Sequence, residues 1–490
     1  MADAPQRRGP PGRGNLTEGP IAKTLLMFAL PTLASSILQS LNGTINAIWV
    51  GRFLGENALA ATSNANMVMF LLSAFVFGFG MASTILIGQA WGRRDVDNAR
   101  HVFGTAMGGF LLVSIAIAAL GYMLAPDILA ILATPPAATP LALAYLRVIF
   151  LAMPALLLLT LAMMALRGAG DSLTPLWFMI VAVLLDSGLN PFFIRGWGPF
   201  PEMGIAGSAM STLVGNYVSL IGLVIYIYWK DLPLRLRGHE VRYLLPTPTI
   251  LKVLFVKGLP MGIQMIVISL SALALVGLVN HEGVATTAAF GVAMQLWTYV
   301  QMPAMALGAA VSAMVAQNIG AGHWERVNRV TGIGIVQSLA ITGGLIVLLT
   351  LADKSVLSLF MGPDSPALPI ARHIHMVATW NFLLFGVMMV LFATVRANGA
   401  VWAPLIILAV GLVGVRFGWI FATRHWLGAD ALWTSFPASS FANLLMAVAY
   451  YLKGGWRKAR LTAEQRPCED ECIEQAEATR EPGGALNPAG

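Results

Sequence analysis

One carboxylate lies deep inside an apolar stretch of the chain. Asp186, in VAVLLDSGLNPFFIRGWG, falls about 13 residues into a predicted span over 173–195, which puts it near the middle of that span at about 1.5 Å per residue. An ionisable group at that depth is costly in lipid and normally faces a water-filled cavity or a partner. Asp186 is therefore the leading candidate for a functional site.

The surroundings of Asp186 in the sequence favour a cation. Asn190 follows at i+4 and shares its helix face, and Pro191 cannot donate a hydrogen bond to the carbonyl of Ser187. Carboxylate, amide and carbonyl oxygens suit a hard cation such as Na⁺, whereas the carboxylate alone can carry a proton. The alternative is that Asp186 stays protonated and bonds a neighbouring helix.

A second polar group lies in the first predicted span. The stretch LQSLNGTINAIWVG contains five polar residues at helical spacing, which are Gln39, Ser40, Asn42, Thr44 and Asn46. Single residues of this kind usually join helices to one another, but five in one stretch favour the wall of a wet cavity. We take Gln39 and Asn42 as candidates for lining that cavity.

Arg416, in LVGVRFGWIF, is a second charge within an apolar stretch. It could line the cavity and attract an anionic group, pair with a carboxylate, or bond carbonyls and extend toward the membrane surface. His373 and His375 lie near the start of the tenth predicted span, where we expect interfacial histidines rather than a proton relay.

These residues must be positioned by helices in a membrane. With 490 residues, 57% hydrophobic, 11% charged and a mean hydropathy of +0.74, the chain has too much apolar surface for a soluble globule. Helices satisfy their own backbone in lipid, and about 20 apolar residues cross the hydrocarbon core. The sequence predicts an all-α integral membrane protein with about twelve transmembrane helices, over 21–50, 61–90, 102–125, 140–166, 173–195, 206–229, 250–279, 286–317, 330–352, 370–395, 402–423 and 432–452.

The chain also repeats itself. Three pairs of matching positions are 229 residues apart and a fourth pair is 228 apart: Pro31 and Pro260, Arg167 and Arg396, Pro175 and Pro404, then Gln89 and Gln317. Such a duplication places a pathway between two like halves that can rock against each other. We expect two pseudo-symmetric six-helix bundles, with a disordered cytoplasmic segment 1–20, a first lobe 21–230, a cytoplasmic linker 231–249, a second lobe 250–453 and a disordered cytoplasmic tail 454–490.

The distribution of basic residues predicts the orientation. Lys and Arg concentrate in alternate connections, which places those connections and both termini in the cytoplasm of a plasma (inner) membrane protein. The net charge of +7 has the same origin and reflects contact with membrane lipids rather than with nucleic acid. Cys468 and Cys472 both lie in the polar tail, so we expect free thiols and no metal centre there.

No motif for enzymatic chemistry is present. The sequence lacks GxxxxGK[ST], HExxH and GxSxG, so we expect neither an enzyme nor a bound cofactor. Energy must then come from an ion gradient or from the gradient of the substrate.

An ordered series of short motifs resembles the multidrug and toxic compound extrusion (MATE) family. The motifs, which span residues from about 20 to 455, are NAIWVGRFLGENALAA, IGQAWGRRD, ALRGAGDSLTP, LNPFFI, MGIAGSAMST, AQNIGAG and VRANGAVWAP. The resemblance implies two six-helix bundles around a V-shaped cavity, and export of cationic or amphipathic compounds in exchange for protons or sodium.

The resemblance also assigns positions to the coupling site. The acid that the family carries in its first span falls at Asn46, and the fifth-span Asn and Asp are exchanged here as Asp186 and Asn190. The sixth-span threonine is Thr212, while acidic positions of the second half fall at Ile268 and Phe385. The resemblance implies a coupling site in the first half, formed by Asp186, Asn190, Asn46 and Thr212. The one metal expected is Na⁺ at Asp186.

The resulting hypothesis is a monomeric secondary antiporter for drug-like or toxic small molecules, coupled to H⁺ or Na⁺. A flippase for lipids or lipid-linked saccharides is the alternative, because related polytopic exporters share this type of architecture. A uniporter, a channel or an intramembrane enzyme would be excluded by uphill transport.

Overall fold

The computed structural model describes residues 15–459 except 133, 135, 137, 199, 363 and 364. Its first half contains six long helices, each of which includes one predicted span. They are α1 (Ile21–Leu54), α2 (Glu56–Gly92), α3 (Val96–Ile131), α4 (Thr139–Gly168), α5 (Leu173–Arg195) and α6 (Ile205–Trp229). This arrangement confirms the six-helix bundle predicted for the first half.

The second half follows the same plan with two interruptions. Its helices are α7 (Pro248–Asn280), α8 (Val284–Gly320), α9 (Trp324–Leu351), α10 (Asp353–Met361), α11 (Leu368–Ala378), α12 (Asn381–Ala397), α13 (Trp402–Ala409), α14 (Arg416–Leu427) and α15 (Asp430–Lys453). The tenth predicted span is divided into α11 and α12, which are bent by 43° relative to each other. A π-helical turn, Val410–Val415, joins α13 to α14 within the eleventh span.

Length and composition allow most of these helices to cross a membrane. Within the described residues, ten helices are long and apolar enough to cross a membrane, and the bent pair α11–α12 makes an eleventh. α15 is 24 residues long but carries polar residues along its middle, and it packs beside α12 and α14. With α15, the second half also forms a bundle of six spans.

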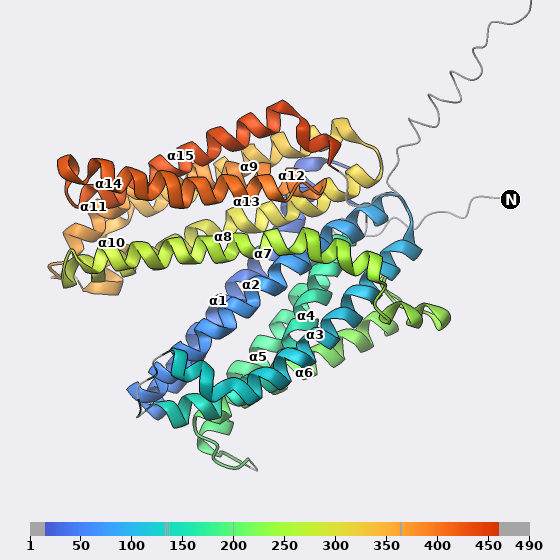
Figure 1. The fold of residues 1–490 in the computed structure, drawn as a ribbon, viewed down its shortest axis with the longest axis horizontal. Helices are drawn as coiled ribbons and strands as arrows, with labels where there is room; N and C mark the ends of the chain where they lie inside the picture. The colour runs from blue at the N-terminus through green and yellow to red at the C-terminus, as the bar shows by residue number, and fades with distance from the viewer. Residues whose placement is uncertain are drawn as a thin grey trace, which may run out of the picture.

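The two bundles meet at one end and diverge toward the other (Figure 1). Where they meet, α2 and α8 approach closely, because a Cβ atom on Gly92 would overlap the carbonyl oxygen of Gln317, and one on Gly320 would overlap that of Gln89. The two contacts are equivalent under the repeat, since each glycine lies three residues after its glutamine. The helices therefore cross about a pseudo-two-fold axis.

Segments outside the spans are anchored at this end. The Leu16 N–H donates to Gln317 Oε1 at 2.9 Å, and Leu16 is 1% exposed. Leu16 is therefore packed against the protein, although the segment 1–20 was predicted to be disordered. Trp456 is fully buried and its carbonyl accepts from Asn398 Nδ2 at 2.8 Å. Residues 1–14 and 460–490, including Cys468 and Cys472, lie outside the described residues.

Candidate functional site

The carboxylate of Asp186 is the centre of a hydrogen-bond network that joins three helices. Asp186 is 3% exposed. Its Oδ2 accepts from the side-chain amides of Asn42 at 2.8 Å and Asn46 at 3.0 Å, both on α1. Its Oδ1 accepts from the hydroxyls of Ser211 at 2.9 Å and Thr212 at 3.0 Å, both on α6. Four donors match the acceptor capacity of an ionised carboxylate.

Two further bonds orient the α1 amides. Ser187 Oγ donates to Asn42 Oδ1 at 2.9 Å, and Asn190 Nδ2 donates to Asn46 Oδ1 at 2.8 Å. Each asparagine of α1 thus accepts from α5 through its oxygen and donates to Asp186 through its nitrogen. Asn190 is fully buried, and its Oδ1 has no partner among the described residues, which leaves one free acceptor beside the network.

Small residues on α6 bring its hydroxyls to Asp186. A Cβ atom on Gly215 would lie 3.1 Å from the carbonyl oxygen of Ala182 and 3.3 Å from the backbone nitrogen of Asp186. A Cβ on Gly207 would overlap the carbonyl oxygen of Phe193. Residues four apart share a helix face, so Gly207, Ser211 and Gly215 form one strip along which α6 touches α5. Close backbone approach at small residues is typical of helix contacts in membranes.

The structure brings together the residues predicted for the coupling site. Asn46 and Thr212 contact Asp186 directly, and Asn190 contacts it through Asn46. Asn42, which was predicted to line the cavity, also bonds the carboxylate. Gln39 is exposed and bonds no described residue. The ion-binding role of these residues stays a prediction.

Two side chains of the network were not predicted from the sequence. Of Ser187, next to Asp186, only the carbonyl was considered and not the hydroxyl, and Ser211, next to Thr212, was not considered. The spacing of Gly207, Ser211 and Gly215 was the available signal for Ser211, because small residues at every fourth position predict a tight helix contact.

Arg416 belongs to a separate cluster in the second lobe. It is 8% exposed, and its Nε and Nη2 atoms donate to Ser439 Oγ at 3.3 Å and 3.2 Å. Its guanidinium carbon lies 4.5 Å from the ring centroid of Phe436. Both partners are on α15, so Arg416 joins α14 to α15 rather than contacting Asp186.

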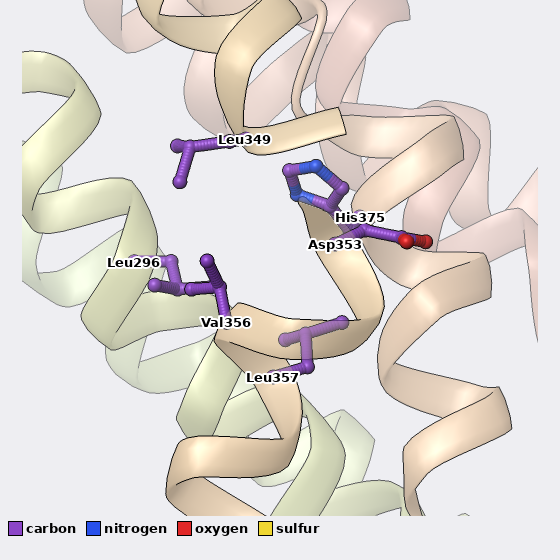
Figure 2. A pocket seen from close by; sticks show the side chains of 6 residues that line it. All are labelled: Leu296, Leu349, Asp353, Val356, Leu357 and His375. Atoms are coloured by element: carbon purple, nitrogen blue, oxygen red, sulfur yellow. The ribbon is translucent and has the colours of Figure 1, made fainter. Parts of the chain in front are cut away.

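A narrow pocket, too small for a water molecule, lies elsewhere in the second lobe. Figure 2 shows its lining, which is His375 of α11, Asp353 of α10 and the aliphatic side chains of Leu296, Leu349, Val356 and Leu357. His375 is 2% exposed, its Nδ1 bonds Thr379 Oγ1 at 2.9 Å, and its Nε2 has no partner among the described residues. His375 is therefore buried within the protein.

The other polar groups near this space form ion pairs. Arg372 donates to both oxygens of Asp353, at 2.7 Å and 3.3 Å, and holds the pKa of that carboxyl below its usual range. His373 bonds Asp430 at 2.8 Å with about half of its side chain exposed. The space is narrow and mostly apolar, so it does not resemble a substrate pocket.

Two helical lobes that meet at one end, with a buried ionisable network in one of them, define a class of polytopic membrane transporter. The chain matches the MatE family in two segments, residues 31–192 and 260–420, which correspond to the two halves of the repeat. It belongs to this family, as the sequence motifs predicted.

Relatives cover nearly the whole chain. "Probable multidrug resistance protein YoeA" of Bacillus subtilis is 36% identical over 442 residues, which are 90% of this chain and 95% of the relative. The "FAD transporter" of Shewanella oneidensis is 25% identical over 443 residues, 90% of this chain and 96% of the relative. A solved structure described as the outward-facing conformation of a multidrug resistance MATE family transporter has a TM-score of 0.81 at 20% identity and covers 90% of this chain and 97% of its own.

Proposed function

We propose that the protein is a secondary antiporter that exports cationic or amphipathic small molecules in exchange for H⁺ or Na⁺. Names of relatives such as the probable multidrug resistance protein YoeA support the substrate class. The observation that carries the coupling role is the buried Asp186 carboxylate, whose four bonds come from two other helices. The relative positions of α1, α5 and α6 therefore depend on whether the Asp186 carboxylate is free or has bound a cation.

The hydroxyl side of the network offers the easier place for a coupling cation. Ser211 Oγ and Thr212 Oγ1 also lie 2.8 Å and 3.4 Å from the carbonyl oxygen of Ser208. Both hydroxyl protons can therefore turn from Asp186 to that carbonyl without moving α6. A proton or Na⁺ then takes Oδ1, while Oδ2 keeps its bonds to α1.

The two lobes supply the conformational change. We infer that the junction of α2 and α8 opens in the opposite state, since its glycine contacts close one end of the molecule. The basic Arg93, Arg94, Arg326 and Arg329 follow these helices, so in our orientation the junction is cytoplasmic and the divergent end faces outward. A monomer contains both lobes and suffices for this cycle.

Competition between cation and substrate follows from the charge of Asp186. The ionised carboxylate attracts a cationic substrate, and a bound proton or Na⁺ removes that attraction. Binding of either ligand then lowers the affinity for the other by the same factor. Export against a gradient results if the cation-bound protein and the substrate-bound protein favour different arrangements of the lobes.

Flux measurements in proteoliposomes test this function. Purified protein should drive efflux of ethidium when a pH gradient or a Na⁺ gradient is imposed, and Asp186→Asn should abolish the driven component. Asp127→Asn is the matched control, because Asp127 is an exposed acid of the same lobe. Driven flux that survives in Asp186→Asn, or the absence of driven flux in the wild type under both gradients, contradicts the proposal.

The flippase alternative has one observation in its favour, which is the buried positive charge of Arg416. It predicts that Arg416→Ala abolishes movement of a labelled lipid across vesicles while Asp186→Asn does not. The antiporter proposal predicts that Asp186→Asn has the larger effect on dye efflux.

A further inference from the structure

Arg416 is a buried charge without a counter-charge. Every acidic residue described between α7 and α15 pairs with a different base: Glu282 with Arg424, Glu325 with Arg329, Asp353 with Arg372, and Asp430 with His373. An uncompensated charge at this depth is costly. The cluster around Arg416 therefore holds a positive charge that no described residue neutralises.

Several hydrogen-bond donors around Arg416 are also unused. A guanidinium has five N–H groups, and the bonds to Ser439 are the only ones that Arg416 makes to described residues. One turn further along α15, Asn443 is 2% exposed, and its Oδ1, which is an acceptor, has no partner among the described residues. Below the guanidinium, the ring of Phe436 packs against Trp297 with centroids 4.8 Å apart. The free N–H groups of Arg416 can bind an anionic group, and the adjacent aromatic rings can contact an apolar part of the same ligand.

The internal repeat shows that this cluster occupies the position of the Asp186 network. Pro404 lies 229 residues after Pro175, whereas Arg416 lies 230 residues after Asp186. The π-helical turn Val410–Val415 lies between these positions, and a π turn accommodates one residue more than an α turn. Arg416 is therefore the structural counterpart of Asp186.

The following helix confirms the correspondence. Gly204 precedes α6 with φ 55° and ψ −133°, and Gly428 precedes α15 with φ 56° and ψ −128°. Aligning these glycines pairs Thr212 with Phe436 and Gly215 with Ser439. Thr212 and Gly215 contact Asp186, and Phe436 and Ser439 contact Arg416. The two lobes thus carry equivalent sites of opposite charge.

We propose that the Arg416 cluster is a second binding site, which takes the carboxylate or phosphate group of an amphipathic molecule. Two oxygens of such a group can accept parallel bonds from one guanidinium, and they would neutralise its charge. The ligand is either a free solute or the head group of a lipid. Binding at this cluster does not depend on antiport.

Binding of phenyl phosphate to purified protein in phosphatidylcholine nanodiscs tests the site. Titration calorimetry should show saturable binding that Arg416→Gln weakens by at least about tenfold, the loss expected for a charge-assisted bond. Arg416→Lys should retain part of the affinity, because it keeps the charge but not the two-pronged geometry. Arg424→Gln is the matched control, since Arg424 is a basic residue of the same helix that pairs with Glu282 at the surface.

Further arms separate the outcomes. If phosphatidylglycerol in the nanodisc competes with phenyl phosphate, the natural ligand is a lipid head group; if it does not, the ligand is a solute. Thermal unfolding and dye binding check that each variant is folded. If Arg416→Gln does not fold, Ser439→Ala is used in its place. Equal affinity in the wild type and in folded Arg416 and Ser439 variants, or no saturable binding in the wild type, overturns the proposal. Phenyl phosphate binding should persist in Asp186→Asn, because Asp186 lies in the other lobe. A failure of the Arg416 site can therefore be distinguished from a failure of the antiport function.

Discussion

At the scale of single residues, the proposed function rests on the hydrogen bonds of one carboxylate. Asp186 receives two amide and two hydroxyl bonds and no ion pair within the described part of the chain. The α1 amides donate to no acceptor other than Asp186 among the described residues. The hydroxyls of Ser211 and Thr212 can also donate to the carbonyl of Ser208. The α1 side of the network is therefore the stiffer one, and the α6 side is the one at which we propose that a cation binds.

Substitution of Asn46 tests the stiff side. Asn46→Ala should destabilise the protein by about 1–3 kcal/mol at every pH, because it removes one donor from Asp186 and leaves Nδ2 of the buried Asn190 without its acceptor. Asn46→Asp instead places two carboxylates together, and one must bind a proton to relieve their repulsion. We expect its thermal unfolding temperature in detergent to be low at pH 8 and to recover toward the wild-type value at pH 5. A pH-independent loss in Asn46→Asp would contradict the ionised state of Asp186.

The sequence predicted the central residue but not all of its partners. Asp186 could be found because a charge in an apolar run has few structural explanations. Ser211 was not predicted, although it lies between Gly207 and Gly215 at helical spacing, because the contact of this strip with α5 is seen only in the structure. The counterpart relation of Asp186 and Arg416 was hidden, because a constant repeat spacing pairs Asp186 with Val415 and only the structure shows the intervening π turn.

At the scale of elements, close contact between α5 and α6 holds the site. The helices touch along Gly207, Ser211 and Gly215, and any larger side chain on that strip would separate Ser211 from the carboxylate. The break between α11 and α12 was missed, since no proline or glycine marks it between residues 376 and 382. Hydrophobicity predicts that a segment crosses the membrane, but it does not predict a bend within the segment.

Glycine substitutions test the α5–α6 contact. Gly207→Ala should destabilise the protein by about 1–3 kcal/mol, because the added methyl group overlaps the carbonyl of Phe193. Gly188→Ala on α5 is the control. No other atom lies near its added methyl group, and alanine favours a helix by up to about 1 kcal/mol. Equal unfolding temperatures for the two variants would show that the contact is not tight.

At the scale of the whole molecule, symmetry in the backbone accompanies opposite chemistry in the sites. The junction of α2 and α8 repeats the same glycine contact in both directions, and the fold is shared with solved MATE structures. The clusters at equivalent positions nevertheless differ, with a carboxylate in one lobe and a guanidinium in the other. A molecule with a positive and a negative group could contact both lobes.

A thiol placed at the junction reports on its opening. Ala316 is fully buried and faces Gly88, so in a background with Cys468→Ser and Cys472→Ser the variant Ala316→Cys should react slowly with a maleimide. Adding Gly320→Ala should accelerate labelling severalfold, because the methyl group cannot fit against Gln89. Gly332→Ala, with open space around it, should leave the rate unchanged. Fast labelling in the absence of Gly320→Ala would show that the junction is not a closed end.

The most direct test of the central claim is the release of cations when substrate binds. Detergent-purified protein in weakly buffered solution is titrated with ethidium while free H⁺ is followed with a pH electrode and bound Na⁺ with a radioactive tracer. We expect the wild type to release close to one H⁺ or one Na⁺ per ethidium bound and Asp186→Asn to release neither. Ethidium binding with equal cation release in both proteins would contradict Asp186 as the residue at which cation and substrate compete.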